Sequence, residues 1–259
     1  MKKFGFTLAE VLITLGIIGV VAALSMPQLI QNHKKAVTSA QLKKFNSVMA
    51  NWASLATNEL GEPRYWNWGS IDAETCTNIY FKPFLKTARI EYGDFSLNIN
   101  EKCTSNNNSS GEAGGLLRTG RKLGGLQTAD PNRCISFFKG DIKFTLNDGS
   151  VFYLAPNAIG TNKPIALDTN GDKGPNKLGR DRFLFNFSYL GGTKRVCNSN
   201  RYICAMRDVK SSDAFAPRSR NEIIAGCKEG YNFGIDRDDC AILLEFDNWE
   251  FKKDYPYKL

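Results

Sequence analysis

The sequence of 259 residues contains a single histidine, His33, and lacks the motifs of the common enzyme families. One imidazole excludes a zinc site built on two histidines, and His33 is followed by Lys34 and Lys35, where a solvated side chain is expected. No two cysteines have C-x-x-C spacing, and no nucleophile elbow, P-loop or dinucleotide fingerprint is present. The sequence therefore predicts a protein that is not an enzyme.

Charge is also scarce near the N-terminus. Between Phe6 and Met26 the only charged residue is Glu10. As a helix this segment is about 31 Å long, which matches the hydrocarbon core of a bilayer. A carboxylate in such a segment costs a few kcal/mol and is rare without a function. Lys2 and Lys3 precede the segment and predict a cytoplasmic N-terminus, with the rest of the chain outside the cytoplasm.

Two ordinary explanations compete for this segment. A secretory signal peptide fits the lysines and the small residues of Ala23-Leu24-Ser25, but its apolar region is usually only about 7–15 residues long. A plain membrane anchor fits the length and leaves Glu10 without a purpose.

The motif Gly5-Phe6-Thr7-Leu8-Ala9-Glu10, followed by an apolar helix, resembles the type III signal sequence of type IV pilins and type II secretion pseudopilins. The resemblance implies that a prepilin peptidase cuts after Gly5 and methylates the new amine of Phe6. Glycine suits the cut because it has no side chain to obstruct a protease. The resemblance also implies that Glu10 pairs with the Phe6 amine of a neighbouring subunit, since a buried charge is tolerated beside a counter-charge.

The expected organisation has four parts: a leader peptide (1–5), a transmembrane or filament-core helix (6–27), an amphipathic helix (28–60) and an extracytoplasmic head (61–259). Pro27 removes one backbone donor and is expected to kink the helix. Gly61 and Pro63 give the stop signal. The second half has an apolar stripe at helical spacing. Its members are Phe45, Val48, Met49, Trp52, Leu55 and Ala56.

The head is expected to be α+β with an antiparallel sheet. Ile142–Leu146 and Ser150–Leu154 flank an Asp-Gly turn and predict a hairpin. Arg182–Leu190 predicts a strand, and Ala241–Phe246 predicts a further strand, with a short buried helix as the alternative. Ser219–Cys227 has weak helical character. The polar stretch from Thr104 to Gly115 predicts a surface loop.

Seven cysteines lie beyond the membrane segment, and outside the cytoplasm disulfides are expected. Pairing of nearest neighbours suggests Cys197–Cys204, Cys227–Cys240 and Cys76–Cys103, which leaves Cys134. Spacing alone does not establish this connectivity.

One acidic loop has the character of a metal site. Asp168, Asn170, Asp172 and Asp181 supply oxygen side chains at spacings similar to the first half of an EF-hand loop, which suits calcium. The loop departs from that pattern because Lys173 takes the place of the usual glycine and Gly179 that of the closing glutamate. Some major pseudopilins have a calcium loop. The alternative is a rigid turn in which Asp and Asn bond to their own backbone.

Aromatic and charged residues follow the long helix in Arg64-Tyr65-Trp66-Asn67-Trp68. Such a cluster either stacks on a base or sugar or, more commonly, caps the core of the head. The formal charge of +8 is compatible with lipid headgroups, acidic polymers or DNA as partners.

Together these features predict a subunit that is anchored by one span in the inner membrane and polymerises into a type II secretion pseudopilus or a type IV pilus. Prepilin peptidase and other pilin-like subunits are its expected partners. Calcium is the one cofactor that the sequence suggests. An adhesin or DNA-binding minor pilin is the alternative, and a membrane-anchored secreted enzyme is the second alternative.

Overall fold

The computed structural model describes residue 5 and the ranges 7–67, 71–86, 89–97, 138–154, 162–171, 173–188, 197, 202–206, 218–229 and 238–259. The loop expected at 104–115, together with Cys103 and Cys134, lies outside these residues.

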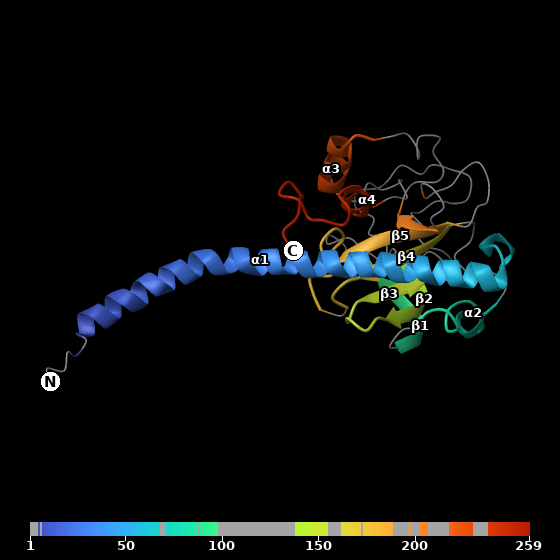
Figure 1. Cartoon of the computed structure of the whole chain (residues 1–259), viewed down its shortest axis with the longest axis horizontal. Coiled ribbons are helices and arrows are strands. Elements are labelled where there is room, and N and C mark those ends of the chain that lie inside the picture. The colour runs from blue at the N-terminus through green and yellow to red at the C-terminus, as the bar shows by residue number, and fades with distance from the viewer. Residues whose placement is uncertain are drawn as a thin grey trace, which may run out of the picture.

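One long helix, α1 (Leu8–Leu60), dominates the molecule and projects from a compact head (Figure 1). The predicted helix is confirmed over these residues. It begins after Thr7, whose side chain caps the first turn, and it ends at Gly61, whose N–H donates to the carbonyl of Thr57. Pro27 lies inside the helix, and α1 curves gently in the half outside the head.

The head contains an antiparallel sheet of six strands, which follow one another in the order β1-β2-β3-β4-β5-β6. The strands are β1 (Arg89–Leu97), β2 (Phe138–Thr145), β3 (Val151–Leu154), β4 (Asn162–Asp168), β5 (Arg182–Ser188) and β6 (Ile203–Ala205). The predicted hairpin is formed by β2 and β3, with Thr145 opposite Val151, and the predicted strand from Arg182 is β5. The expected α+β class is confirmed.

Short helices complete the head: a 3-10 turn (Pro63–Tyr65), α2 (Ala73–Tyr80), α3 (Arg220–Glu229) and α4 (Asp239–Phe246). α2 lies near the far end of α1 (Figure 1). α3 and α4 pack against each other, and α4 contacts β5 and β6. Helix α3 agrees with the weak helical signal at 219–227.

The strand predicted at 241–246 is wrong, because this segment belongs to α4. The cause is Asp238, which precedes the helix and accepts hydrogen bonds from the backbone N–H groups of Cys240 and Ala241. The same carboxylate accepts from the N–H of Leu184 on β5 at 2.9 Å, which ties the helix start to the sheet. Burial raises the pKa of Asp238 to about 6. An apolar run without polar alternation suits a buried helix as well as a buried strand. Here the hydrogen bonds of the Asp238 cap favour the helix.

The core lies where the second half of α1 crosses the sheet. The α1 side chains that are buried there are Thr38, Leu42, Phe45, Met49, Trp52, Ala53 and Ala56. Phe45 packs on Phe185 of β5, with ring centroids 4.8 Å apart, and Trp52 stacks on Phe81 at 4.6 Å. Each fully buried large side chain contributes about 1.5–3 kcal/mol. Leu55, which was expected in the stripe, is 53% exposed, because the helix meets the head through Ala53 and Ala56.

Two disulfides tie the head together, Cys197–Cys204 and Cys227–Cys240. They are two of the pairs suggested by nearest-neighbour spacing. Cys76 is buried in α2, and its expected partner, Cys103, lies outside the described residues, so that pair stays a prediction.

Gly179 has a positive φ of 75° beside the second disulfide, and a Cβ there would lie 2.8 Å from the sulfur of Cys240. Gly149 has a similar φ of 83°, but a Cβ there would meet nothing within 4 Å. We expect Gly149→Ala to cost about 1–2 kcal/mol, from backbone strain alone.

Gly179→Ala should cost about 1–3 kcal/mol more than Gly149→Ala, because it adds a steric clash to the same strain. Denaturant unfolding of the full-length variants in detergent checks both values. Equal losses of stability would contradict the close packing at Gly179.

Candidate functional site

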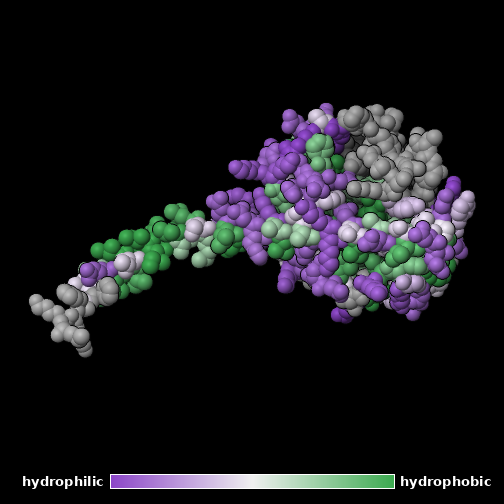
Figure 2. All heavy atoms as spheres, viewed as in Figure 1, coloured by the Kyte–Doolittle hydropathy of each residue, from purple (hydrophilic) through white to green (hydrophobic). Residues whose placement is uncertain are grey.

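The N-terminal half of α1 presents an apolar surface that nothing in the structure covers. Figure 2 shows this half of α1 as a hydrophobic rod that projects from a largely hydrophilic head. Within the described residues, α1 is the one helix long and apolar enough to cross a membrane. Its large exposed side chains are Leu8, Val11, Leu12, Ile13, Leu15, Ile17, Ile18, Val20, Val21, Leu24, Met26, Leu29 and Ile30. Exposure on this scale requires a bilayer or other apolar helices around it.

The single carboxylate of this rod has defined partners at its N-terminal end. Glu10 accepts hydrogen bonds from the backbone N–H and the hydroxyl of Thr7, both at 2.8 Å. The Thr7 hydroxyl in turn accepts from the N–H of Glu10, which completes a capping box. The sequence signal for this box is Thr-x-x-Glu, and sequence reasoning about Glu10 overlooked it. Thr7 therefore belongs to this site together with Glu10.

The expected cleavage site lies just before this cap. Gly5 is exposed and precedes the helix, so the backbone at this point is open to an enzyme. Phe6 lies outside the described residues. The capping box therefore marks where the helix begins, immediately after the expected scissile bond.

Comparison with known proteins identifies this end of the chain. Residues 1–26 match the prokaryotic N-terminal methylation motif, which is the signature of type IV pilins and pseudopilins. No curated protein and no solved structure matches the chain. The motif supports a pilin-type precursor that is processed by prepilin peptidase, anchored in a membrane and assembled with other pilin subunits.

The acidic loop joins β4 to β5 and is held at both ends. Asp168 is 0% exposed, and its carboxylate pairs with the guanidinium of Arg182 at 2.8 Å. Burial raises the pKa of Asp168 to about 6, although Arg182 acts in the opposite direction. Arg182 therefore offsets only part of the cost of burying this carboxylate.

Asp181 stabilises the loop by accepting hydrogen bonds from three N–H donors. Its carboxylate accepts from the backbone N–H groups of Asn176 and Lys177 and from the side-chain amide of Asn170, at 2.6, 2.5 and 3.1 Å. These contacts resemble the turn that was the alternative to a metal site. Among the described residues, no group of three acidic, histidine or cysteine side chains is placed to hold a metal. Asp172 lies outside those residues.

A different set of oxygens surrounds the side chain of Asn176. The side-chain oxygen of Asn176 lies 3.2 Å from Asp168 Oδ2 and from the carbonyl oxygen of Lys173, and 3.3 Å from that of Gly171. The side-chain oxygen of Asn170 is buried and has no hydrogen-bond partner. Two arrangements satisfy the Asn176 group: a cation between the oxygens, or an amide rotated so that its nitrogen donates to them. The rotated amide satisfies the Asn176 group by hydrogen bonds alone, and the same oxygens are of the kind that calcium prefers.

The aromatic cluster after α1 supports the core. Trp66 is 8% exposed, stacks on Tyr80 at 4.9 Å and donates its indole N–H to the carbonyl of Gly61. Tyr65 is exposed, with the Arg64 guanidinium 5.0 Å from its ring centre, and Trp68 lies outside the described residues. Trp66 thus caps the head, as in the commoner of the two interpretations. His33 is exposed on α1.

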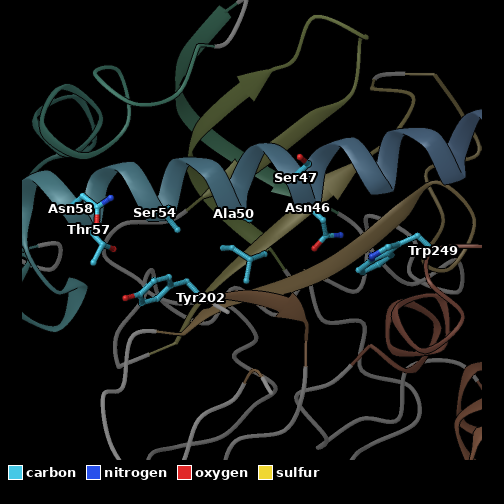
Figure 3. Close-up of a pocket in the computed structure, with 10 residues that line it drawn as sticks. Asn46, Ser47, Ala50, Ser54, Thr57, Asn58, Tyr202 and Trp249 are labelled. Atoms are coloured by element: carbon cyan, nitrogen blue, oxygen red, sulfur yellow. The ribbon is translucent and has the colours of Figure 1, made fainter. Parts of the chain in front are cut away.

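A groove of about 430 Å³ follows α1 beside Tyr202 and Trp249 (Figure 3). Its other lining residues are Asn46, Ser47, Ala50, Ala53, Ser54, Thr57, Asn58 and Ile203. These lining residues contain no carboxylate, amine or thiol, and their hydroxyl groups come from Ser47, Ser54, Thr57 and Tyr202.

Proposed function

We propose that this chain is a structural subunit that polymerises into a type IV pilus or a type II secretion pseudopilus after prepilin peptidase has cleaved it and methylated its new N-terminus. The observation that carries the proposal is the continuity of α1. The methylation motif begins a helix whose first half is fully exposed and apolar, while its second half is embedded in a folded head.

Two environments can cover the exposed apolar half of α1 and remove it from water. In the membrane, lipid chains surround it, and in a filament, the equivalent helices of other subunits take their place. Either environment removes the same apolar side chains from water, so transfer from one to the other exchanges similar contacts. Because this exchange has no large hydrophobic driving force, polar contacts between the helices can help to set their register, and a charge pair is one such contact.

Glu10 is the group that we assign to this role. In the isolated chain its charge is partly satisfied by Thr7 in the capping box. The amine that cleavage creates on Phe6 of an adjacent subunit carries a full positive charge and is a stronger partner for a buried carboxylate. Assembly would then add an ion pair to a carboxylate that already has local hydrogen bonds.

The first prediction concerns processing. The mature protein should begin at N-methylated Phe6, and Gly5→Val should block the cut because a branched side chain obstructs the scissile bond. Mass spectrometry of the N-terminal peptide checks both. A mature start at Met26, or an intact Met1, would show that the segment is a signal peptide or a plain anchor.

The second prediction concerns Glu10. Glu10→Val makes the segment more apolar, so membrane levels should be normal, but incorporation into filaments should be lost because the amine has no partner. Thr7→Val is the matched control, since it removes the hydroxyl of the capping box and keeps the carboxylate. Quantitative immunoblots of membrane and sheared-filament fractions measure both variants. Normal incorporation of Glu10→Val, or equal loss in Thr7→Val, would refute the assigned role.

We also propose that the loop between β4 and β5 binds calcium. Asp168, Asn170 and Asn176 would hold the ion, together with the carbonyls of Gly171 and Lys173, and Asp172 is a further ligand expected from the sequence. The support comes from the unpartnered Asn170 oxygen and from the oxygens around Asn176. In this proposal Asp181 shapes the loop and leaves the ion to the others.

The calcium proposal can be tested by adding a negative charge to the loop. Asn176→Asp places a carboxylate beside Asp168, so the variant should melt below the wild type in chelator and recover in calcium. Wild type should gain about 2.7 kcal/mol when calcium is at a hundredfold excess over its dissociation constant. Thermal melts of full-length protein in detergent measure this, with Asn58→Asp on exposed α1 as the control that calcium should not rescue. Identical wild-type melts with and without calcium would favour the rotated amide.

A further inference from the structure

The last eleven residues of the chain contact α1 at both ends of the segment, and the second contact lies close to the exposed apolar half of the helix. Glu250 pairs with Lys43 at 3.1 Å, the carbonyl of Trp249 accepts from the hydroxyl of Ser39 at 2.6 Å, and the N–H of Leu259 donates to the side chain of Gln31 at 2.9 Å. In Figure 1 the C-terminus lies beside α1 where the helix leaves the head. The tail therefore forms part of the face of the head that surrounds the emerging helix.

Three lysines lie at this face, and we call them the basic collar. They are Lys34 and Lys35, just beyond the apolar part of α1, and Lys258, which precedes the residue that contacts Gln31. Lys34 and Lys258 are exposed and Lys35 is half-buried. Within the described part of the chain, none of the three has a carboxylate within 4.0 Å.

The acidic side chains of the tail do not neutralise the collar. Glu250 is paired with Lys43, Asp247 with Arg220 and Lys252, and Asp254 with Arg220. Among the described residues, the acidic side chains near the collar are therefore already paired with other cations, and the three lysines give the collar a positive charge.

The position of the collar matches that of lipid headgroups. Ile30 is the last of the large apolar side chains of the rod, and Lys34 and Lys35 follow about 6–8 Å along the helix axis. The headgroup region of one leaflet is about 5–8 Å thick. The tail reaches the same level, because Leu259 contacts Gln31. Figure 2 shows hydrophilic side chains around the helix at the point where the hydrophobic rod ends.

We propose that the basic collar binds the anionic phospholipid headgroups of the bilayer that holds α1, and so keeps the head seated on the membrane before assembly. The inference rests on the membrane anchorage of α1 and does not require polymerisation. A lipid surface suits the collar better than a nucleic acid does, because the emerging helix places the bilayer directly against this face.

The test uses the full chain in nanodiscs of phosphatidylcholine, or of phosphatidylcholine mixed with phosphatidylglycerol. Acetylation of each lysine by a water-soluble reagent is followed by mass spectrometry. The collar lysines should react about fivefold more slowly in the anionic discs, and high salt should remove the difference. Lys82 and Lys86, at the far end of the head beside α2, should react equally in both lipids.

A substitution in the tail tests whether the lysines act together. Lys258→Gln should lower the protection of Lys34 and Lys35 in the anionic discs, whereas Lys86→Gln should leave it unchanged. Equal acetylation in the two lipids would overturn the proposal. So would protection by duplex DNA in phosphatidylcholine discs without protection by anionic lipid. A chain that enters neither kind of disc would overturn the anchorage itself, on which the proposed function also depends.

Discussion

The packing of α1 onto the sheet is the interaction on which the rest of the structure depends. Phe45 and Trp52 are fully buried at this contact, among rings from β5 and the segment after α2. Because α1 is one continuous helix, the packing of its second half sets the point at which its first half leaves the head. The same apolar contact therefore holds the sheet against the helix and leaves the first half exposed.

The surroundings of α1 change within a short interval between its two halves. Before Gln31 the helix is exposed and apolar, and from Thr38 onward its inner face is buried in the head. The short interval between them has lysines on the helix and is flanked by the C-terminal tail. This interval therefore separates the exposed apolar half of α1 from the half that is packed into the head.

Local signals explain why much of the fold was predictable. The Asp-Gly turn specifies the β2–β3 hairpin through neighbours in sequence, and the apolar stripe that contains Trp52 specifies one helix face. The segment 241–246 was misassigned because its apolar residues fit a strand or a helix equally well. The Asp238 cap decided for the helix, and its additional bond to Leu184 comes from a residue 54 positions away.

By itself, the sequence determined the long helix, the processing motif and the lone Glu10, because each is written in consecutive residues or in one helical period. Tertiary structure decided which oxygens face each other in the acidic loop. Sequence spacing selected Asp181, but the folded loop surrounds that carboxylate with N–H donors and turns Asn176 toward Asp168. It also placed Leu259 beside Gln31, a contact between opposite ends of the chain. No local pattern encodes such a contact, since it exists only after α1, the sheet and the tail have packed together.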